Sequence, residues 1–172
     1  MTMRLPNWPR LLDEYVDTAR ARPFAWGALD CCSFAAGAVR AITGRDVPMP
    51  SWCDRREAAA TLRRLGGLRA AVCQRLGDMQ PAALARRGDV LLLRQRGRDV
   101  LAVCLGHAWA SPGRAGLAFG PMDEALPSRV TLVTVQVSGW FTVAAAVGAT
   151  KSPGTVAVVV RVQPDWSVTV TV

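Results

Sequence analysis

The sequence predicts an α+β domain, in which helices come first and an antiparallel sheet follows, with a β-rich extension at the C-terminal end. In the first half, apolar residues recur at helical spacing. From Gly88 the period changes to short apolar runs divided by turn residues, which is typical of strands. After about Arg129 the chain is rich in Val and Thr and poor in charge. We therefore divide the chain into a domain over 1–128 and an extension over 129–172.

The helical half contains turn and cap signals that set the limits of its elements. Pro9 suits the first turn of an amphipathic helix, and Gly44 is a typical C-cap. Gly66 and Gly67 separate the last two helices. The expected helices cover 8–20, 30–43, 55–65 and 68–76.

The strands are expected as hairpins. A buried strand over 88–93 is followed by a turn at 96–99 and a returning strand over 100–106. Two further short strands, near 107–111 and 115–119, are bounded by turns at 111–113 and 120–121. The extension adds strands over 156–162 and 167–172, which need a sheet or another subunit to cover their edges.

Composition excludes several classes of protein. No run is long and apolar enough for a membrane span, and the first residues lack the apolar core of a secretory signal, so no Sec export is expected. The five cysteines form no CxxC pair, and His107 is the only histidine. We therefore expect free thiols, no metal site and no cofactor.

The net charge of +8 comes almost wholly from arginine, since Lys151 is the only lysine. A basic protein can attract nucleic acid or an anionic envelope. The arginines are scattered along the sequence, however, and no recognition motif accompanies them. We attribute the charge to genomic base composition and expect no specific nucleic-acid partner.

The strongest chemical signal is the segment 24–34, FAWGALDCCSF. Asp30 is placed as a helix N-cap, and Cys31 falls in the first turn. Unpaired backbone N–H groups and the helix dipole favour a thiolate there. A cysteine hydrolase presents its nucleophile in this way, whereas an isolated cysteine at such a place is more often part of a core. Cys32, about 100° further round the helix, is assigned to packing.

The order of motifs resembles the NlpC/P60-like proteins of bacteriophage tails and prophages, a divergent branch of the papain-like cysteine peptidase superfamily. The resemblance covers about 7–120 and is most specific at Asp30-Cys31 and Gly88-Asp89. Its other parts are a Trp-bearing helix, PFxWGxxDCC, a helix ending in Thr-Gly, RREAA, LGGL, RRGDV and a short strand ending in Leu-Gly. It implies a papain-like fold for the first domain.

The resemblance also implies roles for single residues. Cys31 corresponds to the nucleophile of active members, which cleave peptide bonds in cell-wall stem peptides. The strand that normally opens with the catalytic His corresponds to 100–106, and Val100 stands where that His is expected. The usual base is therefore missing from its place.

Substitutes for the base are few. His107 is the only histidine, but it follows the far end of that strand, roughly 20 Å from the expected place. Asp99 is a weaker substitute, because an ordinary carboxylate is too acidic to be a base for a thiol. Trp26 either lines a substrate groove beside Cys31 or anchors its loop. Asp30 and Asp89 are assigned structural roles.

Two functions remain open. The first is a phage tail protein, at the tail tip or in tail assembly, whose peptidase-like domain is degenerate and structural, with 129–172 docking onto neighbouring tail proteins. The second is an active peptidoglycan endopeptidase that aids cell-wall penetration, with Cys31 as nucleophile and His107 or a partner's residue as base. Both imply localisation in the virion tail, and in the host cytoplasm during assembly. A thiol transferase or amidase would need the same base.

Overall fold

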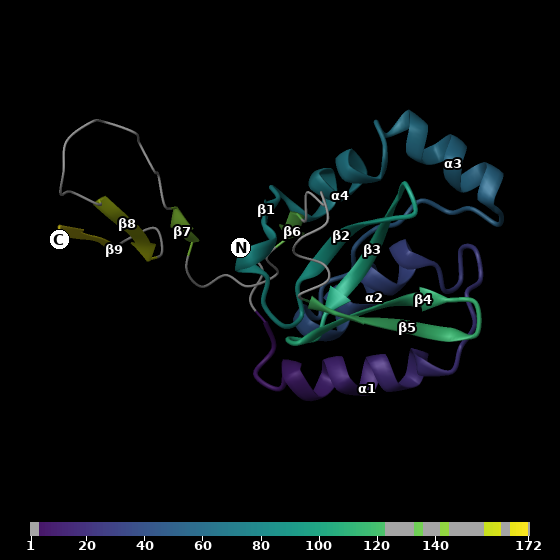
Figure 1. Ribbon diagram of the computed structural model, residues 1–172, viewed down its shortest axis with the longest axis horizontal. Coiled ribbons are helices and arrows are strands. Elements are labelled where there is room, and N and C mark those ends of the chain that lie inside the picture. The colour runs from purple at the N-terminus through teal and green to yellow at the C-terminus, as the bar shows by residue number, and fades with distance from the viewer. Residues whose placement is uncertain (1–3, 123–132, 136–141, 145–156, 163–165, 172) are drawn as a thin grey trace. The chain divides into compact units, whose positions relative to one another are not determined.

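The computed structural model describes residues 4–122, 133–135, 142–144, 157–162 and 166–171. The chain divides into two compact units, Met1–Ser138 and Gly139–Val172. The first unit is an α+β domain (Figure 1), as the sequence predicts. The second unit contains a three-stranded antiparallel sheet in the order β7-β8-β9.

The described residues of the first unit form four α-helices, a short 3-10 helix and six strands, and the predicted helices are confirmed within two residues at each end. The helical elements are α1 Trp8–Arg20, α2 Cys31–Thr43, α3 Arg55–Arg64, α4 Leu68–Leu76 and η1 Ala82–Leu84. The strands are β1 Gln80–Pro81, β2 Val90–Gln95, β3 Arg98–Cys104, β4 Ala108–Gly113, β5 Gly116–Pro121 and β6 Val133–Val135. The second unit holds β7 Thr142–Ala144, β8 Ala157–Val162 and β9 Trp166–Thr171.

The sheet of the first unit has the order β1-β6-β2-β3-β4-β5, with every pairing antiparallel. In the central hairpin Leu92 lies opposite Leu101. Strand β6 pairs with β1 and β2, so the residues over 133–135 belong to this sheet. Composition suggests a division at 128/129, whereas the two compact units meet at 138/139; composition does not show which sheet a strand joins.

One expected turn is also displaced. Residues 111–113 lie inside β4, where Pro112 pairs with Leu117, and the reversal comes at 114–115. Ser-Pro-Gly is a turn signal by composition, but these residues are part of the β4–β5 hairpin. They lie beyond Trp109 and Ala110, the two positions at which β4 pairs with β3.

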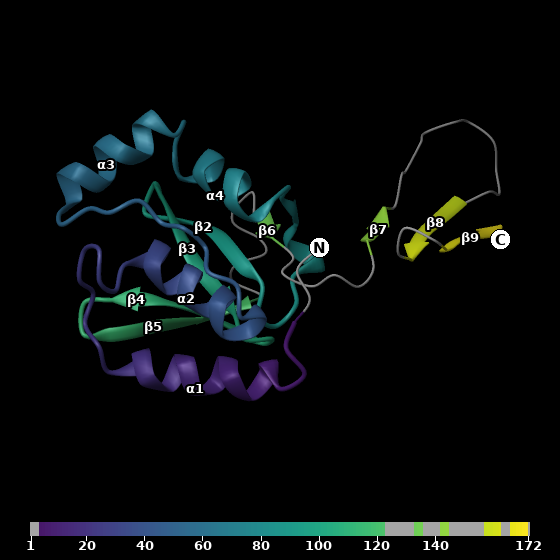
Figure 2. The same cartoon turned by 180° about the vertical axis from the view of Figure 1, so that it is seen from behind.

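The helices cover one face of this sheet, and Figure 2 shows α2 in front of the strands with α1 and α3 at opposite sides. One core cluster joins α2, α3 and α4 to β2 and β3, and a second joins α1 and α2 to β3 and β4. The opposite face carries Leu91, Leu93, Ala102 and Cys104, packed against the η1 region and Trp109. Alternate residues of β2 and β3 thus face opposite layers, as the two-residue period of a strand requires.

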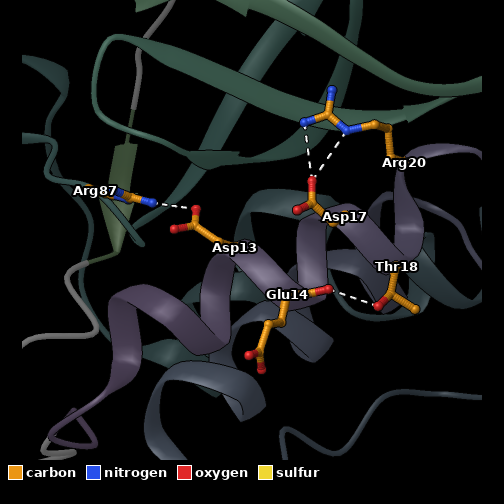
Figure 3. A network of polar contacts seen from close by, with 6 residues as sticks. All are labelled: Asp13, Glu14, Asp17, Thr18, Arg20 and Arg87. Atoms are coloured by element: carbon orange, nitrogen blue, oxygen red, sulfur yellow. Dashed lines mark hydrogen bonds and ion pairs between the residues drawn. The ribbon is translucent and has the colours of Figure 1, made fainter.

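Ion pairs fasten the N-terminal segment and α1 to the start of β2. Arg4 Nη2 lies 2.9 Å from Oδ1 of the fully buried Asp89. Arg4 Nη1 donates a hydrogen bond to the Arg87 carbonyl. Arg87 itself pairs with Asp13 of α1, as Figure 3 shows. These contacts give Asp89 a structural role, as the sequence predicts.

Candidate functional site

Cys31 is the first residue of α2, and the residue before it caps the helix. Asp30 has extended backbone angles, and its Oδ1 accepts hydrogen bonds from the backbone N–H groups of Cys32 at 3.0 Å and Ser33 at 2.9 Å. The Ser33 hydroxyl in turn accepts from the Asp30 N–H at 2.9 Å, which completes a capping box. The predicted N-cap, and with it the place of Cys31 at the positive end of the helix dipole, is confirmed.

The second carboxylate oxygen of Asp30 ties two loops to this helix start. Asp30 Oδ2 accepts from the Gly27 N–H at 2.9 Å and from the Trp52 indole N–H at 2.7 Å. Asp30 is buried, and both its oxygens serve neighbouring donors, so its role is structural. Trp52 is the member of the site that sequence reasoning missed, because nothing local to the Pro-rich loop indicates where its indole points.

The Cys31 thiol is half-buried and packs beside the cluster that contains Trp52 and Leu101. Its pKa lies below the ordinary value of a thiol, chiefly because the Cys32 thiol hydrogen-bonds to it, with a further backbone hydrogen bond from Leu101. Burial opposes this lowering. The same hydrogen bond, together with burial, raises the pKa of Cys32. Cys31 therefore ionises more readily than an ordinary thiol, and the buried Cys32 less readily.

The strand residue that lies against the thiol is apolar. Leu101 of β3 is buried in the same cluster, on the face of the sheet that the helices cover. Val100, where the family resemblance places a catalytic His, packs with the cluster on the opposite face. Both residues belong to β3, and the one that faces the helix layer is Leu101, one position after Val100. Leucine has no group that can accept the thiol proton.

The structure does not bring His107 to Cys31. The Gly88 N–H donates to the Cys104 carbonyl at 2.7 Å, and a Cβ on Gly88 would lie 3.0 Å from Ile42 Cδ1. Cys104 therefore lies near the last turn of α2, about 16 Å along the helix axis from Cys31. His107 follows in the exposed turn beyond β3. The two residues lie near opposite ends of the helix, outside hydrogen-bond reach.

The other candidates are also accounted for. Asp99 is exposed, and its carboxylate accepts a hydrogen bond from Arg94 Nη1 at 2.8 Å across the β2–β3 hairpin. Trp26 stands at the tip of a tight loop closed by the Leu29 N–H donating to the Ala25 carbonyl. It is 39% exposed and packs edge-on against Phe24 with ring centroids 4.8 Å apart. A substrate contact at Trp26 stays a prediction.

An apolar pocket lies beside the thiol pair, between α2, the 47–52 loop, α3, α4 and β3. Its lining includes Cys32, Trp52, Leu62 and Leu101, and Arg75 is the only charged residue among the described ones that line it. It encloses about 400 Å³ of empty space, part of which is open to solvent. Arg75 donates to the carbonyls of Pro48 and Ala71, which fixes the wall of the pocket.

All five cysteines are free thiols. Among the residues that the structure describes, no group of three or more His, Cys, Asp or Glu side chains is arranged to hold a metal ion. Within the same part of the chain, no helix has both the length and the apolar character needed to cross a membrane.

Comparison with known proteins gives one match. A family model described as a domain of unknown function, DUF6950, matches residues 3–127. That span contains the whole thiol site, and it ends before the second unit. No curated protein and no solved structure matches the chain.

Proposed function

Because the chain belongs to the DUF6950 family, whose description names no activity, we propose a function from the thiol site and the sequence resemblance. The protein is a structural component of a bacteriophage or prophage tail, at the tail tip or in its assembly. Its first unit is a papain-like domain that has kept the nucleophile position and lost the base. On this proposal it resides in the virion tail, and in the host cytoplasm while the tail is assembled.

The proposal that the site is degenerate rests on one observation: the β3 residue that lies against the Cys31 thiol is Leu101. Peptide hydrolysis by a thiol needs a group that takes the thiol proton and later gives a proton to the leaving amine. A lowered pKa can supply the thiolate by itself, but it cannot supply the acid for the leaving amine. Asp30 is held by four donors and Asp99 by Arg94, so neither is free for that task.

The second unit supports the structural half of the proposal. Gly139–Val172 forms a compact unit with its own three-stranded sheet. A sheet this small is marginal alone in water and gains stability when another surface covers it. We therefore assign this unit to docking on a neighbouring tail protein.

The experiment is digestion of purified peptidoglycan by the full chain, with released peptides identified by mass spectrometry. Wild type and Cys31→Ala are compared from pH 5 to 9. We expect neither protein to release peptides, with circular dichroism showing that both are folded. Release by wild type that disappears in Cys31→Ala would refute the degenerate site.

A second candidate, an active cell-wall endopeptidase, is favoured by the lowered pKa of Cys31. It requires a base from another chain, since no described side chain supplies one. The same digestion with isolated tail particles tests it. Particles that carry wild-type protein would release peptides, and particles that carry Cys31→Ala would not.

A further inference from the structure

Helix α3 carries positive charge that the rest of the fold does not neutralise. Arg55 and Arg56 occupy its first turn, and Arg63 and Arg64 its last. All four are exposed, and none forms an ion pair with any residue in the described part of the chain. These four arginines lie within ten consecutive residues of the sequence, and all belong to one helix.

Three of these arginines share the outer surface of the helix. At 100° per residue, Arg56, Arg63 and Arg64 fall within an arc of about 100°. The buried Ala58 and the half-buried Leu62 lie on the opposite side, toward the core. In Figures 1 and 2, α3 lies at the side of the domain away from α1. We call Arg56, Arg63 and Arg64 the α3 arginine face.

The stability of the helix itself accounts for only some of these arginines. Arg63 and Arg64 stand in the last turn, where positive charge is favoured by the helix dipole. Arg56 stands in the first turn, where the same dipole disfavours it. The nearby carboxylates are engaged at the helix start, because Asp54 accepts from the Glu57 N–H and Glu57 accepts from the Cys53 N–H. Neither forms an ion pair with Arg56.

The shape of this face fits a phosphate backbone. Arg56 and Arg63 are seven residues apart, about 10 Å along the axis. Between them, within the same arc, lies the small side chain of Ala60, which lets a ligand approach the helix closely. Guanidinium groups bind phosphate oxygens through two parallel hydrogen bonds, which an ammonium group does not offer.

We propose that the α3 arginine face binds the phosphate backbone of double-stranded DNA without reading its sequence. The duplex presents a dense and rigid array of charge, about one per 1.7 Å of axis, that a rigid helix face can engage. Its major groove, about 12 Å wide, admits an α-helix. This inference goes beyond the proposed structural role in the tail and does not rest on the state of the thiol site.

The test measures binding of the full-length protein to a fluorescent 20-base-pair duplex of mixed sequence, by anisotropy, from 50 to 200 mM NaCl. The variant Arg56→Gln/Arg63→Gln/Arg64→Gln removes three charges, and glutamine has nearly the same helix propensity as arginine. The matched control is Arg10→Gln/Arg20→Gln/Arg40→Gln. It removes equal charge from exposed arginines that are paired with Glu14, Asp17 and Asp46, the second of which Figure 3 shows.

The α3 variant is expected to bind about tenfold or more weakly at 100 mM NaCl. Its slope of log affinity against log salt should be shallower by about 2.7, since each lost phosphate contact removes about 0.9. The control variant should keep the wild-type slope. Equal loss of affinity in both variants would mean that net charge alone explains the effect, and this would overturn the proposal.

Two further binding measurements test whether DNA is the preferred ligand. Absence of wild-type binding to the duplex at 50 mM NaCl would overturn the proposal. So would equal or tighter binding to polyglutamate or to a polyglycerol-phosphate of matched charge, because the face would then not select a DNA backbone. Weaker binding to both polymers, with the α3 variant reduced only toward the duplex, is the expected result.

Discussion

The Trp52 indole N–H donates to Asp30 Oδ2 at 2.7 Å, and both residues are buried. This one bond joins the loop before α3 to the residue that caps α2. Because the remaining acceptor capacity of Asp30 serves the Gly27, Cys32 and Ser33 N–H groups, the start of α2 is a fully satisfied polar centre inside an apolar core. The position of the Cys31 thiol depends on this centre.

Trp52→Phe tests that bond. The variant leaves a buried carboxylate oxygen with one donor fewer, and the loss of a hydrogen bond to a charged group should lower the free energy of unfolding by about 2 kcal/mol. Denaturant unfolding measures it. Trp109→Phe is the control, since the Trp109 indole donates no hydrogen bond to a described residue. This variant should lower the free energy of unfolding by less. Equal losses would mean that ring volume, and not the hydrogen bond, holds the loop.

Gly27→Ala tests the close approach of the same two loops. Gly27 has φ +70°, and a Cβ there would meet the Trp52 carbonyl. Gly97 has φ +75°, and no atom of the described residues lies within 4 Å of such a Cβ. Gly97→Ala should therefore lower the free energy of unfolding only by the penalty of a left-handed backbone, about 1–2 kcal/mol. Gly27→Ala should lower the free energy of unfolding by clearly more, because the loop must also move. Thermal or denaturant unfolding measures both variants. Equal costs would contradict the contact.

The thiols should differ in the pH dependence of alkylation. The lowered pKa of Cys31 means that its thiolate forms at lower pH than that of an ordinary cysteine, so its rate–pH midpoint should lie below that of an unperturbed thiol. Cys53 is exposed, but its hydrogen bond to Glu57 and the charge of that residue raise its pKa, which moves its midpoint upward. Iodoacetamide labelling with peptide mass spectrometry measures both. A midpoint for Cys31 at or above that of Cys53 would refute the activated thiol.

The buried ion pair between Arg4 and Asp89 should behave as a coupled unit. Arg4→Met or Asp89→Asn alone leaves one buried charge without its main counter-charge and should cost about 3–5 kcal/mol. The double variant should cost less than the two single losses together, by more than about 1 kcal/mol. A double-mutant cycle by urea unfolding provides the check. Strict additivity would show that the two side chains act independently.

Removal of Gly139–Val172 should leave the first unit folded and abolish docking. The six-stranded sheet lies wholly within Met1–Ser138, so the truncated chain should keep its circular dichroism spectrum and cooperative melting. Co-sedimentation with tail particles that lack this protein should be lost, while the full chain binds. A truncated chain that still binds these particles would remove the docking role from the second unit.

The sequence by itself determined the features that depend on neighbours a few residues apart. The helix limits, the Asp30 N-cap and the Gly44 C-cap all follow from local backbone hydrogen bonding and backbone geometry. For the same reason, the sequence correctly placed Cys31 at the first turn of a helix. Such contacts are encoded within one stretch of chain and do not depend on how the chain folds further away.

Only the tertiary structure decided what surrounds that thiol. Strand side chains alternate between faces, so a shift of one residue decides whether Val100 or Leu101 meets the helix layer, and a motif alone does not set that register. The distance from His107 to Cys31 depends on how β3 lies along α2, and the Trp52 bond depends on where a loop returns. These relationships join residues far apart in sequence, and packing of the whole core determines them.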